Sequence, residues 1–224
     1  AGEALCAEVN AELAAHIAEE YGVESRLELE FEKYYVRFLL PPMRGSDKGR
    51  AKGYAGLRVA DGEEWVEIVG MEAVRRDWTR LAHQLQRQIL DLLFHDAGPE
   101  AIEQCAVEWV RALHAGEKDQ DLVFRKSLRK PVAAYTRNVP PHVQAARLLP
   151  KPRGVIQYVV TRDGPQPAGY LTAEPDYEHY ARKQIEPLLA SIAHVSPIDV
   201  ELAMKGAASL FDAQVWADLK RKTR

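Results

Sequence analysis

The sequence predicts an α+β fold, with strands near the N-terminus and mainly helices afterwards. Three patterns indicate this arrangement. Apolar residues recur every three or four positions over residues 5–17 and 81–92, which is the period of an amphipathic helix. Alternating residues flank Asp61-Gly62, a favoured pair for a tight hairpin turn. A short apolar run at 155–161 adds a small strand element to the helical part.

The first seventy residues contain the elements of a helix-plus-sheet unit. A helix over 4–20 is expected to pack one face on a sheet, because its leucine and valine residues follow one stripe. Apolar and acidic residues alternate over 27–38 but change phase near Lys33, which predicts a strand with a bulge. Strands near 53–60 and 64–70 complete the predicted hairpin.

The remaining chain has the pattern of a helical domain with interruptions. Two long helices are predicted between residues 81 and 113. Prolines break the stretch 122–154 into short helices, and the segment 163–169 reads as a loop because it is rich in Gly and Pro. A further helix is expected from about Asp176, with a kink at Pro187.

The composition is that of a globular protein. The 224 residues are 46% hydrophobic and 28% charged, no apolar run is long enough to cross a membrane, and the start lacks a signal-peptide pattern. A cytoplasmic protein without a membrane partner is therefore expected. Cys6 and Cys105 lie far apart and without metal-ligand spacing, which favours two buried free thiols.

The charge distribution indicates a polyanionic partner. Between residues 122 and 162 there is no Asp or Glu, yet nine of the 30 basic residues lie there, which leaves 21 basic against all 33 acidic residues elsewhere. A solvated face normally mixes both signs, so one sign over this length favours phosphates of nucleic acid. A second basic cluster, near the predicted hairpin, contains Arg44, Lys48, Arg50, Lys52 and Arg58.

Two smaller patterns allow a functional and a plain interpretation. Glu28, Glu30 and Glu32 lie on one side of the predicted strand and could hold a divalent cation, although a solvated sheet face would look the same. Lys52 and Tyr54 share a face and suit phosphates or minor-groove acceptors, although a solvent-facing hairpin is the alternative. Motifs for phosphate loops, serine hydrolases and zinc proteases are absent.

Five ordered blocks resemble the C-terminal third of family B DNA polymerases, most closely the bacterial DNA polymerase II branch. They are LELEFEKYYVRFLLPPMRGSDKGRAKGYAGL, GMEAVRRDW, RNVPPHVQAARL, GVIQYVV and DYEHYARKQIEPLL, and the likeness covers residues 1–195. The resemblance implies the rear of the palm over residues 1–90 and a mainly helical thumb with a small strand element over residues 91–224.

The resemblance also implies a role for individual residues. Glu30 and Glu32 become candidates for an additional metal ion. In the family, a Lys/Tyr element contacts the DNA near the primer terminus, and Lys52 and Tyr54 match it here. Ala51 and Gly53 stand where the family has basic residues, which weakens this element. Contacts to primer-template duplex are expected from Arg44, Arg50, Lys52, Tyr54, Arg76, Arg125, Lys126, Arg129, Lys130, Arg137, His142 and Arg147.

The family's chemistry is phosphoryl transfer by two aspartates that hold Mg2+ ions. The blocks that carry these aspartates are absent, so Mg2+ is expected in the complete polymerase and not bound to this chain. The expected partners are the duplex and the catalytic part, in the same chain or as a separate subunit, and the expected location is the nucleoid. The alternative is a stand-alone duplex-binding module derived from a polymerase.

Overall fold

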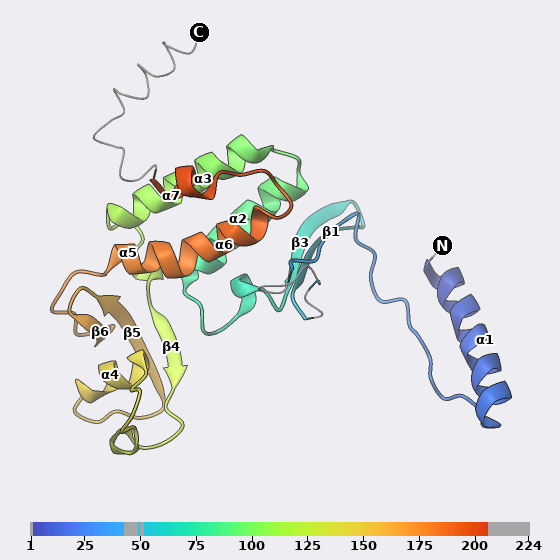
Figure 1. The fold of residues 1–224 in the computed structure, drawn as a ribbon, viewed down its shortest axis with the longest axis horizontal. Helices are drawn as coiled ribbons and strands as arrows, with labels where there is room; N and C mark the ends of the chain where they lie inside the picture. Colours follow the sequence, from blue (N-terminus) through green and yellow to red (C-terminus); the bar gives the residue numbers. More distant parts are fainter. Residues whose placement is uncertain (1, 43–48, 50–51, 206–224) are drawn as a thin grey trace, which may run out of the picture. The chain divides into compact units, whose positions relative to one another are not determined.

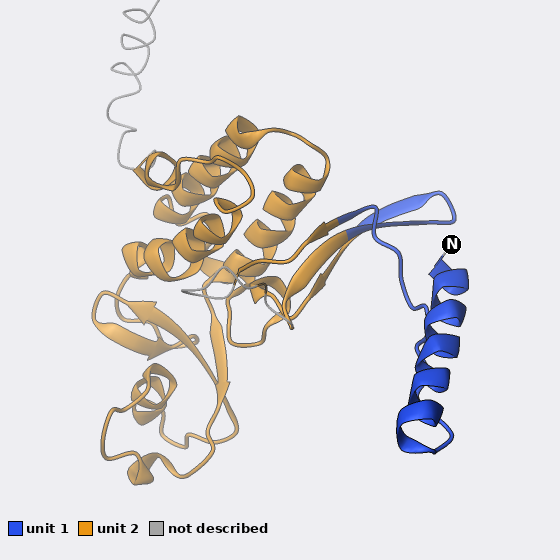
Figure 2. Ribbon diagram, turned by 45° about the vertical axis from the view of Figure 1, so that its right-hand side comes forward, with its two compact units in different colours: residues 1–37, 57–65 blue, residues 38–56, 66–224 orange. Residues whose placement is uncertain are grey.

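A computed structural model describes residues 2–42, 49 and 52–205, and its elements are mixed helices and strands, as the α+β prediction requires (Figure 1). These residues divide into two compact units (Figure 2). Unit 1 comprises residues 1–37 and 57–65, and unit 2 comprises residues 38–56 and 66–224. The boundary predicted between palm and thumb, at residue 90, falls inside a helix, and the division itself stays a prediction.

Unit 1 begins with α1 (Gly2–Tyr21), but the predicted packing of this helix on a sheet is wrong, because no residue of α1 is buried. Asn10 instead joins α1 to the segment that follows. Its side-chain amide donates to the Leu29 carbonyl at 2.9 Å and accepts the Leu29 N–H at 2.8 Å.

The strand predicted over 27–38 is largely wrong as well. Residues 24–35 have no regular secondary structure, and only β1 (Arg37–Leu39) is a strand. Leu27, Leu29 and Phe31 are exposed. A strand needs a neighbouring backbone for its N–H and C=O groups, and in this segment the Asn10 side chain serves Leu29 in that role.

The predicted hairpin is confirmed. The strands β2 (Tyr54–Ala60) and β3 (Glu63–Val69) lie in a three-stranded sheet of order β1-β2-β3. Asp61 and Gly62 both have positive φ, at 56° and 81°, which is the conformation of the two-residue turn that suits the twist of a hairpin.

The helical layer belongs to unit 2, and its elements gather together in Figure 1. Its core contains the predicted stripes, for Leu81, Leu85 and Ile89 are fully buried, as are Ala106 and Leu113. The helices are α2 (Arg80–Phe94), α3 (Pro99–His114), α5 (Tyr177–Tyr180), a π-helical turn (Ala181–Ile185), α6 (Glu186–Ile192) and α7 (Val200–Lys205).

A second sheet, of order β4-β5-β6, carries the other layer of unit 2. The strand β5 (Val155–Thr161) matches the predicted one, and it pairs antiparallel with β4 (Phe124–Ser127) and β6 (Gly164–Pro167). The prediction of short helices for 124–127 and of a loop for 164–167 is therefore wrong. The helix α4 (Pro141–Arg147) packs through Ala145 and Ala146 on this sheet.

Tyr180 joins the helical layer to the second sheet. Its ring is fully buried and stacks on Phe124 at a centroid distance of 5.6 Å. Its hydroxyl donates to the Leu122 carbonyl at 2.8 Å and accepts the Val160 N–H at 2.9 Å. Burial raises the pKa of Tyr180, so the hydroxyl keeps the proton that it donates.

Replacing Gly70 by alanine should destabilise the fold strongly. Gly70 has φ +63°, and a Cβ there would clash with the Lys52 carbonyl oxygen. The backbone must therefore shift, and we expect a loss of about 3 kcal/mol or more in the free energy of unfolding, measured by urea denaturation. The matched control is Gly62→Ala, at φ +81° with nothing within 4 Å, which should cost only about 1 kcal/mol. Equal losses would contradict this account.

Tyr180→Phe removes the hydroxyl and leaves the stacking in place. The Val160 N–H and the Leu122 carbonyl then lose a buried partner, so the free energy of unfolding should fall by about 1–3 kcal/mol. Tyr170→Phe is the matched control, because Tyr170 is 72% exposed, and it should change little. A Tyr180→Phe protein as stable as the wild type would show that the two hydrogen bonds do not join the layers.

Candidate nucleic-acid interface

A groove of about 890 Å³ runs across unit 2 and is rich in arginine. One wall is the segment from residue 75 to His83, and the other combines residues 120–129 with two positions of β5. We call it the basic groove. Its lining residues are Arg75, Arg76, Asp77, Trp78, Arg80, His83, Gln120, Asp121, Val123, Arg125, Lys126, Ser127, Arg129, Val155 and Gln157.

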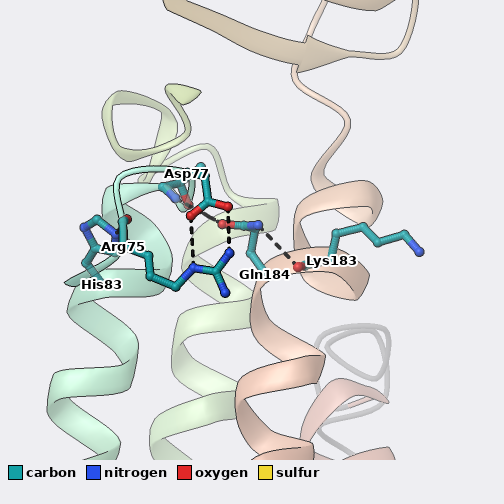
Figure 3. Close-up of polar contacts among 6 residues, drawn as sticks. Arg75, Asp77, His83, Lys183 and Gln184 are labelled. Carbon is teal, nitrogen blue, oxygen red and sulfur yellow. Dashed lines mark hydrogen bonds and ion pairs between the residues drawn. The ribbon is translucent and has the colours of Figure 1, made fainter. Parts of the chain in front are cut away.

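On the first wall, Arg75 and Asp77 form a two-pronged ion pair (Figure 3). The Arg75 Nε donates to Asp77 Oδ1 at 3.0 Å, and its Nη2 donates to Oδ2 at 2.7 Å. These hydrogen bonds lower the pKa of Asp77, so the carboxylate stays ionised below the ordinary carboxyl pKa, and the pair is lost only as the pH falls through the lowered pKa. The His83 Nε2 lies 2.8 Å from the Arg75 carbonyl oxygen and holds the backbone of the same residue.

The two acidic groups that line the groove are both next to an arginine. Asp77 pairs with Arg75, and Asp121 lies 3.3 Å from the Arg80 Nε. Their charges are therefore compensated locally. The other cationic side chains of the described lining are Arg76, Arg125, Lys126 and Arg129, and all four are exposed, so the groove presents positive charge to solvent.

Aromatic packing positions the second wall. Phe124 begins β4 and its ring stacks between Tyr158, at 5.3 Å, and Tyr180, at 5.6 Å. The register then places Arg125 opposite Gln157 of β5. The basic side chains of β4 are therefore carried by a strand whose apolar first residue is anchored in the core.

Tyr135 organises the basic residues that follow β4. Its hydroxyl accepts the Arg129 N–H at 3.3 Å, and its carbonyl accepts Arg147 Nη2 at 2.8 Å. The Lys130 ammonium lies 4.5 Å from the centroid of the Tyr135 ring, within the range of a cation–π contact. One aromatic residue thereby gathers three of the predicted DNA contacts.

The structure brings together some of the predicted contacts and separates others. Arg76, Arg125, Lys126 and Arg129 line the basic groove. Lys130 and Arg147 lie around Tyr135, and Arg137 is exposed. Arg44 and Arg50 lie outside the described residues.

The Lys/Tyr element and His142 differ from that group. Lys52 is exposed, while Tyr54 is half-buried with its ring 5.3 Å from Phe38, and neither lines the basic groove. His142 is only 8% exposed and packs edge-on against Tyr135, so the structure gives its ring a packing role. Burial and the nearby Lys126 lower the pKa of His142, which favours its neutral form. A DNA contact from any of these three residues stays a prediction.

Sequence reasoning missed Arg75 and Arg80, which line the groove, and Gln184, whose Oε1 accepts hydrogen bonds from the neighbouring Thr79. Arg75 and Arg80 flank the predicted Arg76 in the sequence, and their position beside it was the available signal. Gln184 has no such signal, because it lies 105 positions after its partner Thr79.

Metal ligation gains no support from the described part of the chain. Glu30 and Glu32 are exposed in a segment without regular secondary structure. No group of three or more His, Cys, Asp or Glu residues that could hold a metal ion occurs in the residues that the structure describes. Over those same residues, no helix is both long and apolar enough to cross a membrane.

Comparison with known proteins assigns the family. Residues 3–199 match the family described as DNA polymerase family B. The chain is 39% identical over 222 residues to DNA polymerase II of Escherichia coli. That alignment covers 94% of this chain and 28% of the relative. It is 33% identical over 153 residues to DNA polymerase 2 of Aeropyrum pernix, covering 61% of this chain and 18% of that protein.

A third relative is a DNA polymerase of Pyrococcus glycovorans, 29% identical over 182 residues, or 74% of this chain and 22% of that protein. The chain therefore spans less than a third of the length of each of these relatives. The family match covers residues 3–199, and the 39% identity extends over 94% of this chain. The chain therefore belongs to family B of the DNA-directed DNA polymerases.

Proposed function

We propose that the basic groove binds the sugar-phosphate backbone of primer-template duplex as part of a DNA-directed DNA polymerase. The observation that carries the proposal is the meeting of two basic segments, at residues 75–80 and 125–129, in one groove whose acidic residues are already paired. Membership of the polymerase family supports duplex DNA as the polyanion.

The lining suits phosphates better than bases. Arginine presents several N–H donors in a planar fork that matches phosphate oxygens, and the groove has three exposed arginines in addition to Arg75 and Arg80. Contacts of this kind fix the position of a duplex without reading its sequence. A polymerase requires such a grip, because it must accept every template.

The proposed function assigns chemistry and grip to different parts of the polymerase. The described residues contain no cluster of metal ligands. The catalytic carboxylates, with the Mg2+ ions that they hold, would come from the polymerase's catalytic part, either in the same chain or as a separate subunit. The primer-side contacts of Lys52 and Tyr54 and the palm and thumb assignments belong to this proposal, as does residence on the nucleoid through duplex binding.

Charge reversal in the groove should weaken duplex binding. Arg125→Glu and Arg129→Glu should each raise the Kd for a fluorescent primer-template duplex about tenfold, because each loses a charged hydrogen bond to phosphate. The slope of log affinity against log salt should become shallower by roughly 0.9 per lost phosphate contact. Fluorescence anisotropy over a salt series measures both quantities.

The matched control is Arg111→Glu, the same charge change at an exposed position of α3 that does not line the basic groove. It should leave the Kd within about twofold, because exposed charges more than about 10 Å from a phosphate are largely screened at 0.1 M salt. Equal losses for all three variants would mean that net charge alone attracts DNA, and would overturn the groove assignment.

Primer extension tests the division between grip and chemistry. The 224-residue chain with Mg2+ and deoxynucleotides should incorporate no nucleotide, whereas the complete polymerase should do so. In that polymerase, Arg125→Glu should raise the KM for DNA about tenfold and leave kcat within about twofold, because it removes a binding contact and no catalytic group. A fall in kcat alone would contradict this division. Duplex binding by a natural protein that lacks a catalytic part would instead establish a stand-alone module.

A further inference from the structure

We infer that Gln184 is a positioning residue for DNA binding, which holds the first wall of the basic groove in place through the N-cap of α2. The inference rests on the proposed function of that groove. Gln184 does not line the groove, and it is only 5% exposed. It therefore acts on the bound DNA through another residue, Thr79.

The Gln184 carboxamide makes its hydrogen bonds within the fold (Figure 3). Its Oε1 accepts the Thr79 N–H at 3.1 Å and the Thr79 hydroxyl at 2.9 Å. Its Nε2 donates to the Lys183 carbonyl at 3.3 Å. The two partners of the amide oxygen Oε1 are both donors, so the orientation of the amide is fixed by chemistry.

A proline removes the usual α-helical partner of the Lys183 carbonyl. In an α-helix this carbonyl would accept the N–H of the residue four positions later, but that residue is Pro187, which has no N–H. The π-helical turn Ala181–Ile185 ends two residues before this proline. Turns of this kind are frequent at functional sites, because they change the direction in which a side chain points. Here the turn carries Gln184.

Thr79 connects this turn to the groove. It is fully buried, it is the N-cap of α2, and its hydroxyl accepts the Ala82 N–H at 3.5 Å. The residues on either side of Thr79, Trp78 and Arg80, both line the basic groove. The hydrogen bonds from Gln184 therefore hold the backbone at Thr79 against a helical turn that is distant in sequence. This backbone carries Arg75, Arg76 and Arg80 into the groove.

The decisive variant is Gln184→Met, which keeps the length and the neutral charge of the side chain and removes all three hydrogen bonds. We expect about fivefold to tenfold weaker binding of primer-template duplex by the 224-residue chain, with a salt slope shallower by roughly one, because the first wall no longer holds its phosphate contact. Urea denaturation establishes that the variant is folded under the binding conditions. A purely structural role would lower stability and leave the salt slope unchanged.

Three further variants make the result specific. Thr79→Ser keeps both donors to Gln184 and should bind like the wild type. Thr79→Val loses the hydroxyl but keeps the N–H, so it should bind about twofold to threefold more weakly, and it decides the question if Gln184→Met does not fold. Gln104→Met, at an exposed position of α3 outside the groove, is the matched control and should have no effect.

The outcomes separate this inference from the proposal on which it rests. If the wild type binds duplex and both Gln184→Met and Thr79→Val bind with the same affinity and salt slope, the role of Gln184 is overturned. The groove assignment then still stands. A wild-type chain that does not bind duplex even at low salt overturns both.

Discussion

The structure of unit 2 depends on one buried tyrosine. Tyr180 contributes its ring to the stack with Phe124 and Tyr158, and its hydroxyl serves a carbonyl and an N–H from two different segments. A hydroxyl can do this in a dry interior only if both of its roles, donor and acceptor, are filled. Since Leu122 precedes β4 and Val160 belongs to β5, the same group fixes the helical layer to two adjacent strands.

The basic groove follows from this connection. One wall belongs to the loop and helix anchored by Thr79 and Gln184, and the other belongs to β4, which begins at Phe124. Both anchors lie in the same stretch of helix, since Tyr180 ends α5 and Gln184 lies in the next turn. Positive charges held on two such walls repel each other, and the buried contacts of both anchors oppose that repulsion together with the ion pairs of Asp77 and Asp121.

The features predictable from sequence were local ones. The Asp61-Gly62 turn, the stripes of α2 and α3 and the run of β5 each carry their signal within a few residues. The strand predicted over 27–38 failed because alternation describes a face and supplies no pairing partner. The strand β6 was missed because Pro165 and Pro167 argue against a strand, yet β6 is an edge strand, and prolines two apart leave the same side of the strand without donors.

In the candidate site, too, local features could be predicted from the sequence and those that depend on distant residues could not. The absence of acidic residues over 122–162 can be read directly from the sequence, and Arg125, Lys126 and Arg129 from this stretch line the basic groove. Burial of His142 cannot be read from the sequence in the same way, since it depends on tertiary packing that includes an edge-on contact with Tyr135. The strand β4 was hidden for a related reason: three of its four residues are polar, and its partner begins only after residue 154.

That separation between β4 and β5 has a consequence for the order of folding. The strands β5 and β6 are joined by two residues and can pair as soon as they meet, whereas β4 must close a loop of residues 128–154 before it can pair with β5. Closing the longer loop costs more chain entropy, so pairs that are distant in sequence form after the local ones. The wall that carries Arg125 is thus a late product of folding, and a nascent chain would complete the basic groove only after its hairpins and helices have formed.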